Sequence, residues 1–119
     1  MITDLMDRFC LEKSVYWEPS GLDNYGMKTY SSPVEVKTRW EMGMQEVKRA
    51  EGQVEVSTAV VYVLQEMKVG GYIWKGRLED LTTDQKSNPK LLRDVCEILE
   101  YNELTSIYTD GVVRKVLVR

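Results

Sequence analysis

Residues 54–64 read Val-Glu-Val-Ser-Thr-Ala-Val-Val-Tyr-Val-Leu, and they form the strongest strand signal in this chain. The first half alternates between apolar and polar residues, which is typical of a strand with one buried face. The second half is apolar at every position. We therefore expect this end of the strand to be buried on both sides or to enter a contact between subunits.

Other segments show related patterns. Residues 34–40 alternate, with Val34, Val36, Thr38 and Trp40 on one face and Glu35, Lys37 and Arg39 on the other. Residues 13–18, 72–75 and 112–118 also predict strands, and residues 44–50 continue extended. Glu51-Gly52-Gln53 predicts a hairpin connection, Lys68-Val69-Gly70-Gly71 a turn, and Thr109-Asp110-Gly111 another turn.

Two segments leave alternatives open. Leu91, Leu92, Val95, Ile98 and Leu99 fit helical spacing, and Asn88-Pro89 would cap and start such a helix. The competing interpretation makes residues 93–101 a strand. The N-terminal segment, residues 1–11, is either a short amphipathic helix or a terminus that orders only against a neighbour.

Six or seven short strands separated by turns, without long helices between them, predict a mainly β protein. The expected fold is a small antiparallel β-barrel or sandwich, forming a single domain over residues 1–119. Residues 19–33 and 77–90 are rich in polar and turn-forming residues and predict two long loops. Loops of this length in a compact domain are usually functional or disordered.

The composition excludes several kinds of chemistry. The chain contains no histidine and no Cys-x-x-Cys pair, so a Cys/His zinc site and imidazole catalysis are ruled out. Asp80 and Asp84, with Thr82 and Thr83 between them, lack the spacing of a calcium loop. Cys10 and Cys96 are expected to be reduced, buried thiols. We therefore expect that the protein is not an enzyme, has no catalytic residue and binds neither a cofactor nor a metal.

The charge and hydropathy also limit the partners. The net charge is −3, and tight DNA binding requires a surplus of Lys and Arg. No apolar run approaches ~18 residues, which predicts no membrane span, and the first residues do not resemble a signal peptide. The aromatic residues are interpreted mainly as core and interface packing.

One ordered series of motifs resembles small phage proteins known as head–tail joining or head-closure proteins. Asp23-Asn24-Tyr25-Gly26, Pro33 and Arg39-Trp40-Glu41 are similar to the family pattern D-x-Y/F-G … P … R-W-E/D. The later parts that match are the run from Gly52 to Val63, Val69-Gly70-Gly71-Tyr72, Gly76, and Val113-Arg114-Lys115-Val116-Leu117. The resemblance covers residues 13–118. Gly71 departs from it, because the family generally has Asp there.

The resemblance implies a β-barrel that forms a homo-oligomeric ring beneath the portal or an adaptor protein of a tailed bacteriophage, with a strand at about residues 93–101. Such a stopper ring retains the packaged DNA, which passes through its lumen without sequence-specific binding, and it presents a docking surface for tail terminator or other tail proteins. The expected location is the virion neck, after assembly from the host cytoplasm, with no contact to a membrane.

Candidate residues for interface or lumen contact lie in the two long loops: Asp23, Tyr25, Gly26, Met27, Lys28, Tyr30, Asp80, Thr82, Asp84 and Lys86. Residues expected to define the fold are Trp40, Gly52, Gly70, Gly71, Tyr72 and Trp74. A second hypothesis is a small OB-like or SH3-like barrel that binds a peptide or a nucleic acid.

Overall fold

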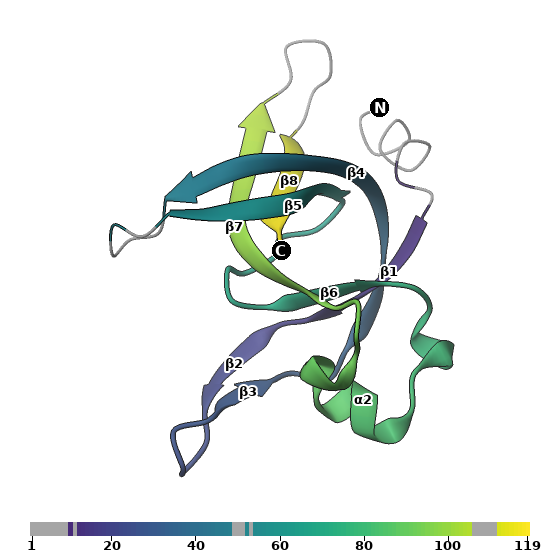
Figure 1. Ribbon diagram of the computed structural model, residues 1–119. Helices are drawn as coiled ribbons and strands as arrows, with labels where there is room; N and C mark the ends of the chain where they lie inside the picture. The colour runs from purple at the N-terminus through teal and green to yellow at the C-terminus, as the bar shows by residue number, and fades with distance from the viewer. Residues whose placement is uncertain (1–9, 11, 49–51, 53, 106–111) are drawn as a thin grey trace.

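Six strands form a closed antiparallel barrel in the order β1-β4-β5-β8-β7-β6 (Figure 1). The computed structural model describes residues 10, 12–48, 52, 54–105 and 112–119. The barrel strands are β1 (Glu12–Trp17), β4 (Val34–Lys48), β5 (Val54–Val63), β6 (Tyr72–Lys75), β7 (Cys96–Thr105) and β8 (Val112–Val118). The predicted mainly β fold and small barrel are confirmed.

The barrel closes because β1 pairs along both of its edges. Ser14 lies opposite Val36 of β4 on one side and opposite Lys75 of β6 on the other. A closed barrel leaves no free strand edge, which removes the usual site of edge-to-edge aggregation. The alternation of β1 then divides its side chains between the barrel interior and the outside.

The interior of the barrel is filled by apolar side chains from all six strands. The predicted alternation of residues 34–40 is confirmed: Val36 and Thr38 are buried and Trp40 is half-buried, although Val34 at the strand start is exposed. The interior cluster consists of Tyr16, Val36, Ala59, Val61, Val63, Met67, Ile73, Ile98, Val116 and Val118.

Two further apolar clusters use the opposite faces of these strands. Val15 and Trp17 of β1 pack with Leu81 and Leu92 from the connection between β6 and β7. Val47, Val60, Leu99 and Leu117 form the other cluster, on the reverse side of β5 and β8. The second half of β5 is therefore buried on both sides, as its continuous apolar run predicts.

Strand β4 contains a bulge. Its pairing with β5 shifts between Met42 and Gln45, so the ladder accommodates an extra residue there. Before the bulge, the even-numbered Trp40 lies opposite Val61; after it, the odd-numbered Val47 lies opposite Glu55. The predicted hairpin between β4 and β5 is confirmed by this pairing, and Gly52 adopts a positive φ of 84°.

The two long loops are more ordered than predicted. Residues 19–33 contain β2 (Pro19–Leu22) and β3 (Lys28–Tyr30), which form a separate two-stranded sheet. The described residues thus hold eight strands, more than the six or seven expected. Residues 77–90 contain the turn η1 (Leu78–Asp80), the helix α2 (Thr83–Ser87) and the start of the turn η2 (Pro89–Leu91). These strands and helical turns are too short to show a repeating pattern of apolar residues, so the sequence did not predict them.

The helical interpretation of residues 91–99 is wrong, because residues 92–94 form a bend and a turn and Cys96–Leu99 belongs to β7. The strand that the resemblance implies at about residues 93–101 is correct from Cys96 onward, but residues 93–95 are not part of it. Asn88 does cap a helical turn, accepting a hydrogen bond from the Lys90 amide, but this turn ends at Leu91. Ile98 and Leu99 are buried in different clusters, which a two-sided strand also explains.

Some predictions fall outside the described residues. These are the N-terminal helix over residues 1–9 and 11, the turn at residues 109–111, and Glu51 and Gln53 of the hairpin connection. Neither Cys10 nor Cys96 forms a disulfide with a described residue. Cys10 is buried, as predicted, whereas Cys96 is only half-buried.

Glycines shape the start and end of β6. The Gly71 amide donates to the Lys68 carbonyl at 3.2 Å, which closes the predicted turn, and Gly70 has a φ of 92°. A Cβ at Gly71 would lie 2.7 Å from the Trp17 carbonyl oxygen. The site therefore has no room for the aspartate that the resembling family carries. At the other end, the Trp74 ring lies over Gly76.

A polar network crosses the barrel interior beside Trp40. The Trp40 indole N–H donates to Ser14 Oγ at 2.8 Å, and the Ser14 and Thr38 hydroxyls share a hydrogen bond of 2.7 Å. Thr38 donates to the Glu12 carbonyl oxygen at 3.1 Å. The Glu12 carboxylate binds Lys75, which lowers the pKa of Glu12, and it also accepts from the Trp40 amide.

Replacing Ser14 by alanine should destabilise the protein by about 1–3 kcal/mol, because the buried Thr38 hydroxyl and the Trp40 N–H lose their shared partner. Denaturant unfolding followed by tryptophan fluorescence measures this change. The control is Ser20→Ala, which removes an exposed hydrogen bond to Thr29 and should cost less than about 0.5 kcal/mol. Equal losses for the two variants would contradict the role of the network.

Gly71→Ala should destabilise the protein by about 1–3 kcal/mol, because the added methyl group overlaps the backbone of β1. Gly43→Ala is the matched control, since a Cβ at Gly43 meets nothing within 4 Å. Thermal unfolding of both variants tests this prediction, and a Gly71 variant as stable as the Gly43 variant would refute it.

Candidate functional site

The sheet formed by β2 and β3 projects from the barrel as an arm (Figure 1). We call residues 19–30 the hairpin arm. Its strands are short and their pairing is irregular between Pro19 and Gly21. The arm carries six of the predicted interface residues, Asp23, Tyr25, Gly26, Met27, Lys28 and Tyr30, which confirms only that they lie together.

The tip of the hairpin arm is held by Asp23. One carboxylate oxygen of Asp23 accepts from the amides of Tyr25 at 2.8 Å and Met27 at 2.9 Å. The Asp23 amide donates to the Met27 carbonyl at 2.8 Å, and the Gly26 amide donates to the Asp23 carbonyl at 3.1 Å. Gly26 has a φ of 78°, which favours glycine. The D-x-Y-G motif is thus a self-contained turn.

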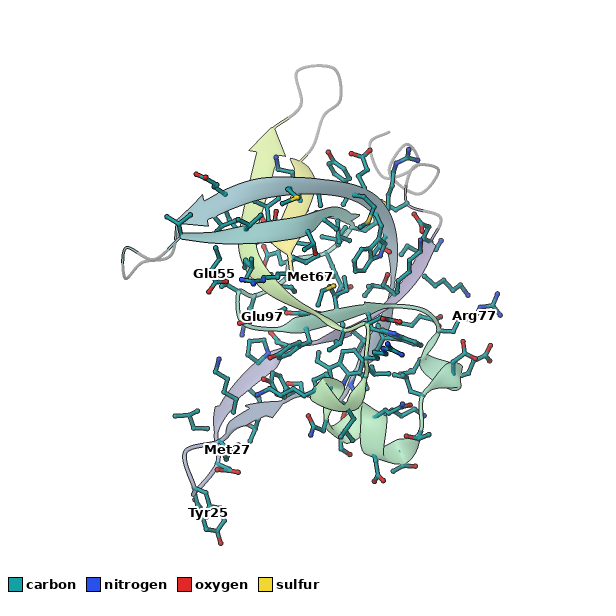
Figure 2. The ribbon with its side chains drawn as sticks, viewed as in Figure 1. Tyr25, Met27, Glu55, Met67, Arg77 and Glu97 are labelled. Atoms are coloured by element: carbon teal, nitrogen blue, oxygen red, sulfur yellow. The ribbon has the colours of Figure 1, made fainter. Side chains whose placement is uncertain are left out.

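This turn directs large apolar side chains into solvent. Tyr25 is 89% exposed, Leu22 68% and Met27 62%. Figure 2 shows Tyr25 at the far end of the arm, pointing away from the barrel, and Met27 close behind it on the arm. Single exposed apolar residues are ordinary, but a group of them on a projecting hairpin is typical of a contact surface. Tyrosine is also enriched at the centre of protein interfaces.

The base of the arm is anchored on the barrel through two tyrosines. The rings of Tyr30 and Tyr72 meet edge to face, with centroids 5.4 Å apart and an interplanar angle of 77°. Burial raises the pKa of Tyr72 to about 12 and also raises the pKa of Tyr30. The Ser31 amide donates to the Glu18 carbonyl at 2.9 Å. Tyr72, which was expected to define the fold, therefore also anchors the base of the arm through its contact with Tyr30.

The second predicted loop packs beside the arm. The Trp17 indole N–H donates to the Lys86 carbonyl at 3.0 Å, which ties α2 to β1. Thr82 and Gln85 form a reciprocal capping box at the start of α2. The predicted residues Asp80, Thr82, Asp84 and Lys86 are all exposed. Of these, Thr82 has a structural role, and Lys86 faces the space between the two segments.

That space contains two adjoining hollows of about 430 and 450 Å³, which we call together the lysine groove. Three lysines, Lys28, Lys86 and Lys90, line it, and none of its lining residues is acidic. Tyr30 and Ser87 line both hollows. The structure thus brings the two predicted loops together at a basic surface, although the whole chain is acidic. Lys90 was not among the predicted site residues, because it stands at the end of the predicted loop and belongs to no motif.

A second projecting surface was not predicted. The outer part of the β4–β5 hairpin, which we call the β4–β5 arm, exposes Met42 at 83%, Met44 at 79%, Val54 at 53% and Val56 at 37%. Alternation alone would place Met42 on the inward face with Trp40. The Met42-Gly43-Met44 sequence sits at the bulge, and this interruption of the pattern is the one signal that could have identified the surface.

The described residues offer little chemistry beyond these surfaces. Among them, no group of three or more acidic, cysteine or histidine residues could hold a metal ion. No helix in this part of the chain is long and apolar enough to cross a membrane.

Comparison with known proteins adds no relative: no family model matches the chain, and no curated protein matches it.

Asp23→Ala should free the tip of the hairpin arm without unfolding the barrel. Loss of one shared acceptor should speed hydrogen exchange at the Tyr25 and Met27 amides by about tenfold, since each hydrogen bond is worth about 1 kcal/mol. NMR-detected exchange measures this, with the melting temperature as a check on the barrel. Asp23→Asn, which keeps an acceptor oxygen, should exchange more slowly than Asp23→Ala. Unchanged exchange in the alanine variant would show that Asp23 does not order the tip.

Proposed function

We propose that this protein is a structural subunit of a tailed bacteriophage, forming a head-closure ring beneath the portal or adaptor. In this role it retains the packaged DNA and offers a docking surface to tail proteins. The observation that carries the proposal is a closed barrel whose two projecting hairpins expose large apolar side chains at separate places.

Exposed apolar surface of this kind is satisfied by contact with other proteins. The hairpin arm and the β4–β5 arm are different surfaces on different strands. An interface between two unlike surfaces is heterologous, and repetition of such an interface builds a ring when the rotation closes. A stable barrel with rigid projections is a suitable subunit for this type of assembly.

The sequence resemblance supports the same role. Its most distinctive motif, Asp23-Asn24-Tyr25-Gly26, corresponds to the ordered tip of the hairpin arm. The Arg39-Trp40-Glu41 motif lies in β4, where Trp40 contributes to the interior network. The first of these two motifs thus presents a surface, and the second supports the fold. We propose no enzymatic activity for the chain.

A second candidate function is a binding module for a peptide or nucleic acid. The lysine groove favours this candidate, because three lysines without a neighbouring carboxylate in the groove could receive an anionic ligand. Binding of short oligonucleotides that weakens steeply with salt would support it over the ring function.

The ring function is tested by mixing the purified protein with the portal protein, or with portal and adaptor, of the phage from which it comes. Electron microscopy should show an added ring on the portal. The double variant Tyr25→Ser/Met27→Ser should bind at least about tenfold more weakly, because it removes exposed anchors of about 1–2 kcal/mol each, and its melting temperature should stay unchanged.

Val69→Ser is the control for this experiment, since Val69 is an exposed apolar residue that belongs to the turn before β6 and to neither arm. It should bind the portal like the unmodified protein. The ring function is rejected if the unmodified protein adds nothing to the portal or its complex with the adaptor.

A further inference from the structure

We propose that the β4–β5 arm of one copy docks into the lysine groove of a second copy of this chain. The inference rests on the proposed ring function and assigns the two surfaces that meet between neighbouring subunits. It is carried by the contrast in charge between two apolar-bearing surfaces of the same molecule.

The β4–β5 arm is acidic as well as apolar. Its described residues, 41–48, 52 and 54–56, contain three glutamates, Glu41, Glu46 and Glu55, against Lys48. Glu41 lies 3.6 Å from Arg39 and remains about half exposed. Glu46 is exposed beside the bulge. The exposed methionines Met42 and Met44 therefore lie next to carboxylates that face solvent.

The lysine groove has the complementary character. Within the described part of the chain, no carboxylate lies within salt-bridge distance of Lys28, Lys86 or Lys90. Three other lysines differ, because Lys13, Lys68 and Lys75 each pair with a glutamate of their own copy. Met27 and Tyr30 add apolar surface to the groove. The groove thus offers both unpaired positive charge and apolar contact.

A second copy satisfies both surfaces in one contact. The arm would place Met42 and Met44 against Met27 and Tyr30 while Glu41 and Glu46 approach the lysines, which gives apolar burial with complementary charge at the rim. DNA would satisfy the lysines alone and would leave the arm exposed. Because the arm and the groove differ, each copy can bind one neighbour with its arm and another with its groove.

Charge reversal tests this pairing. The groove variant carries Lys28→Glu and Lys90→Glu, and the arm variant carries Glu41→Lys and Glu46→Lys. Self-association is followed by sedimentation and by NMR shift changes up to about 1 mM protein, a range that detects contacts of about 4 kcal/mol. The unmodified protein should show concentration-dependent shifts at the arm and the groove. Each variant alone should associate at least about tenfold more weakly.

An equimolar mixture of the two variants should restore association. The acidic arm of the groove variant then meets the basic groove of the arm variant, and the reversed pair is complementary as well. Lys37→Glu/Lys115→Glu, which makes the same charge change on barrel strands away from both surfaces, should associate like the unmodified protein. Circular dichroism of each variant shows that the barrel is intact.

Several results would overturn the docking contact: no association of the unmodified protein in this range, full association of either variant alone, or a mixture that fails to recover. A salt-sensitive gel shift with duplex DNA that the groove variant alone abolishes, with self-association unchanged, would assign the groove to DNA.

If the unmodified protein and both variants form rings on the portal, the docking contact is rejected and the ring function stands. If the variants behave as expected but the unmodified protein does not bind the portal, the ring function falls.

Discussion

Closure of the barrel requires β1 to hydrogen-bond along both edges within six residues. Such a strand has one face turned to the interior and one turned outward, and pairing on both edges fixes its register. Ser14 and Tyr16 are thereby fixed inside, where they meet the Trp40 network and the apolar core. Val15 and Trp17 are fixed outside, where the β6–β7 connection covers them.

The hairpin arm and the lysine groove both depend on this position of β1. The hairpin arm follows directly from the end of β1, and Trp17 holds α2 through its indole N–H. The lysine groove exists because these two segments lie on the same side of the barrel, with Tyr30 and Tyr72 as the contact at the root of the arm. The β4–β5 arm depends on the bulge, which lets one long strand serve the barrel with one part and project with the other. A rigid barrel thus carries projecting surfaces whose positions are set by its own strand pairing.

Alternation predicted the elements whose faces differ in polarity, such as residues 34–40 and 54–63, and these define the barrel. It failed at Leu91, Val95 and Ile98, whose spacing fits a helix by coincidence. Pairing with β6 and then with β8 makes the residues from Cys96 onward a strand. The short strands of the hairpin arm have no apolar alternation, because they bury little. Asp23, Tyr25 and Lys86 were identified as loop residues, but the groove could not be predicted, since its lysines come from segments that only the folded chain brings together. The exposed methionines were missed because the period of two breaks at Met42-Gly43-Met44, and the alternation before a break does not predict which side chains are exposed beyond it.

The absence of space at Gly71 has a consequence for the way in which the hairpin arm leaves the barrel. The obstacle to a side chain there is the main chain of β1 at Trp17, together with Pro19 at the root of the hairpin arm. Any side chain at position 71 would therefore push against residues that stand about fifty positions earlier in the sequence. The backbone would have to take a different course where the arm leaves the barrel, so the angle of the arm is coupled to the presence of glycine at this one position.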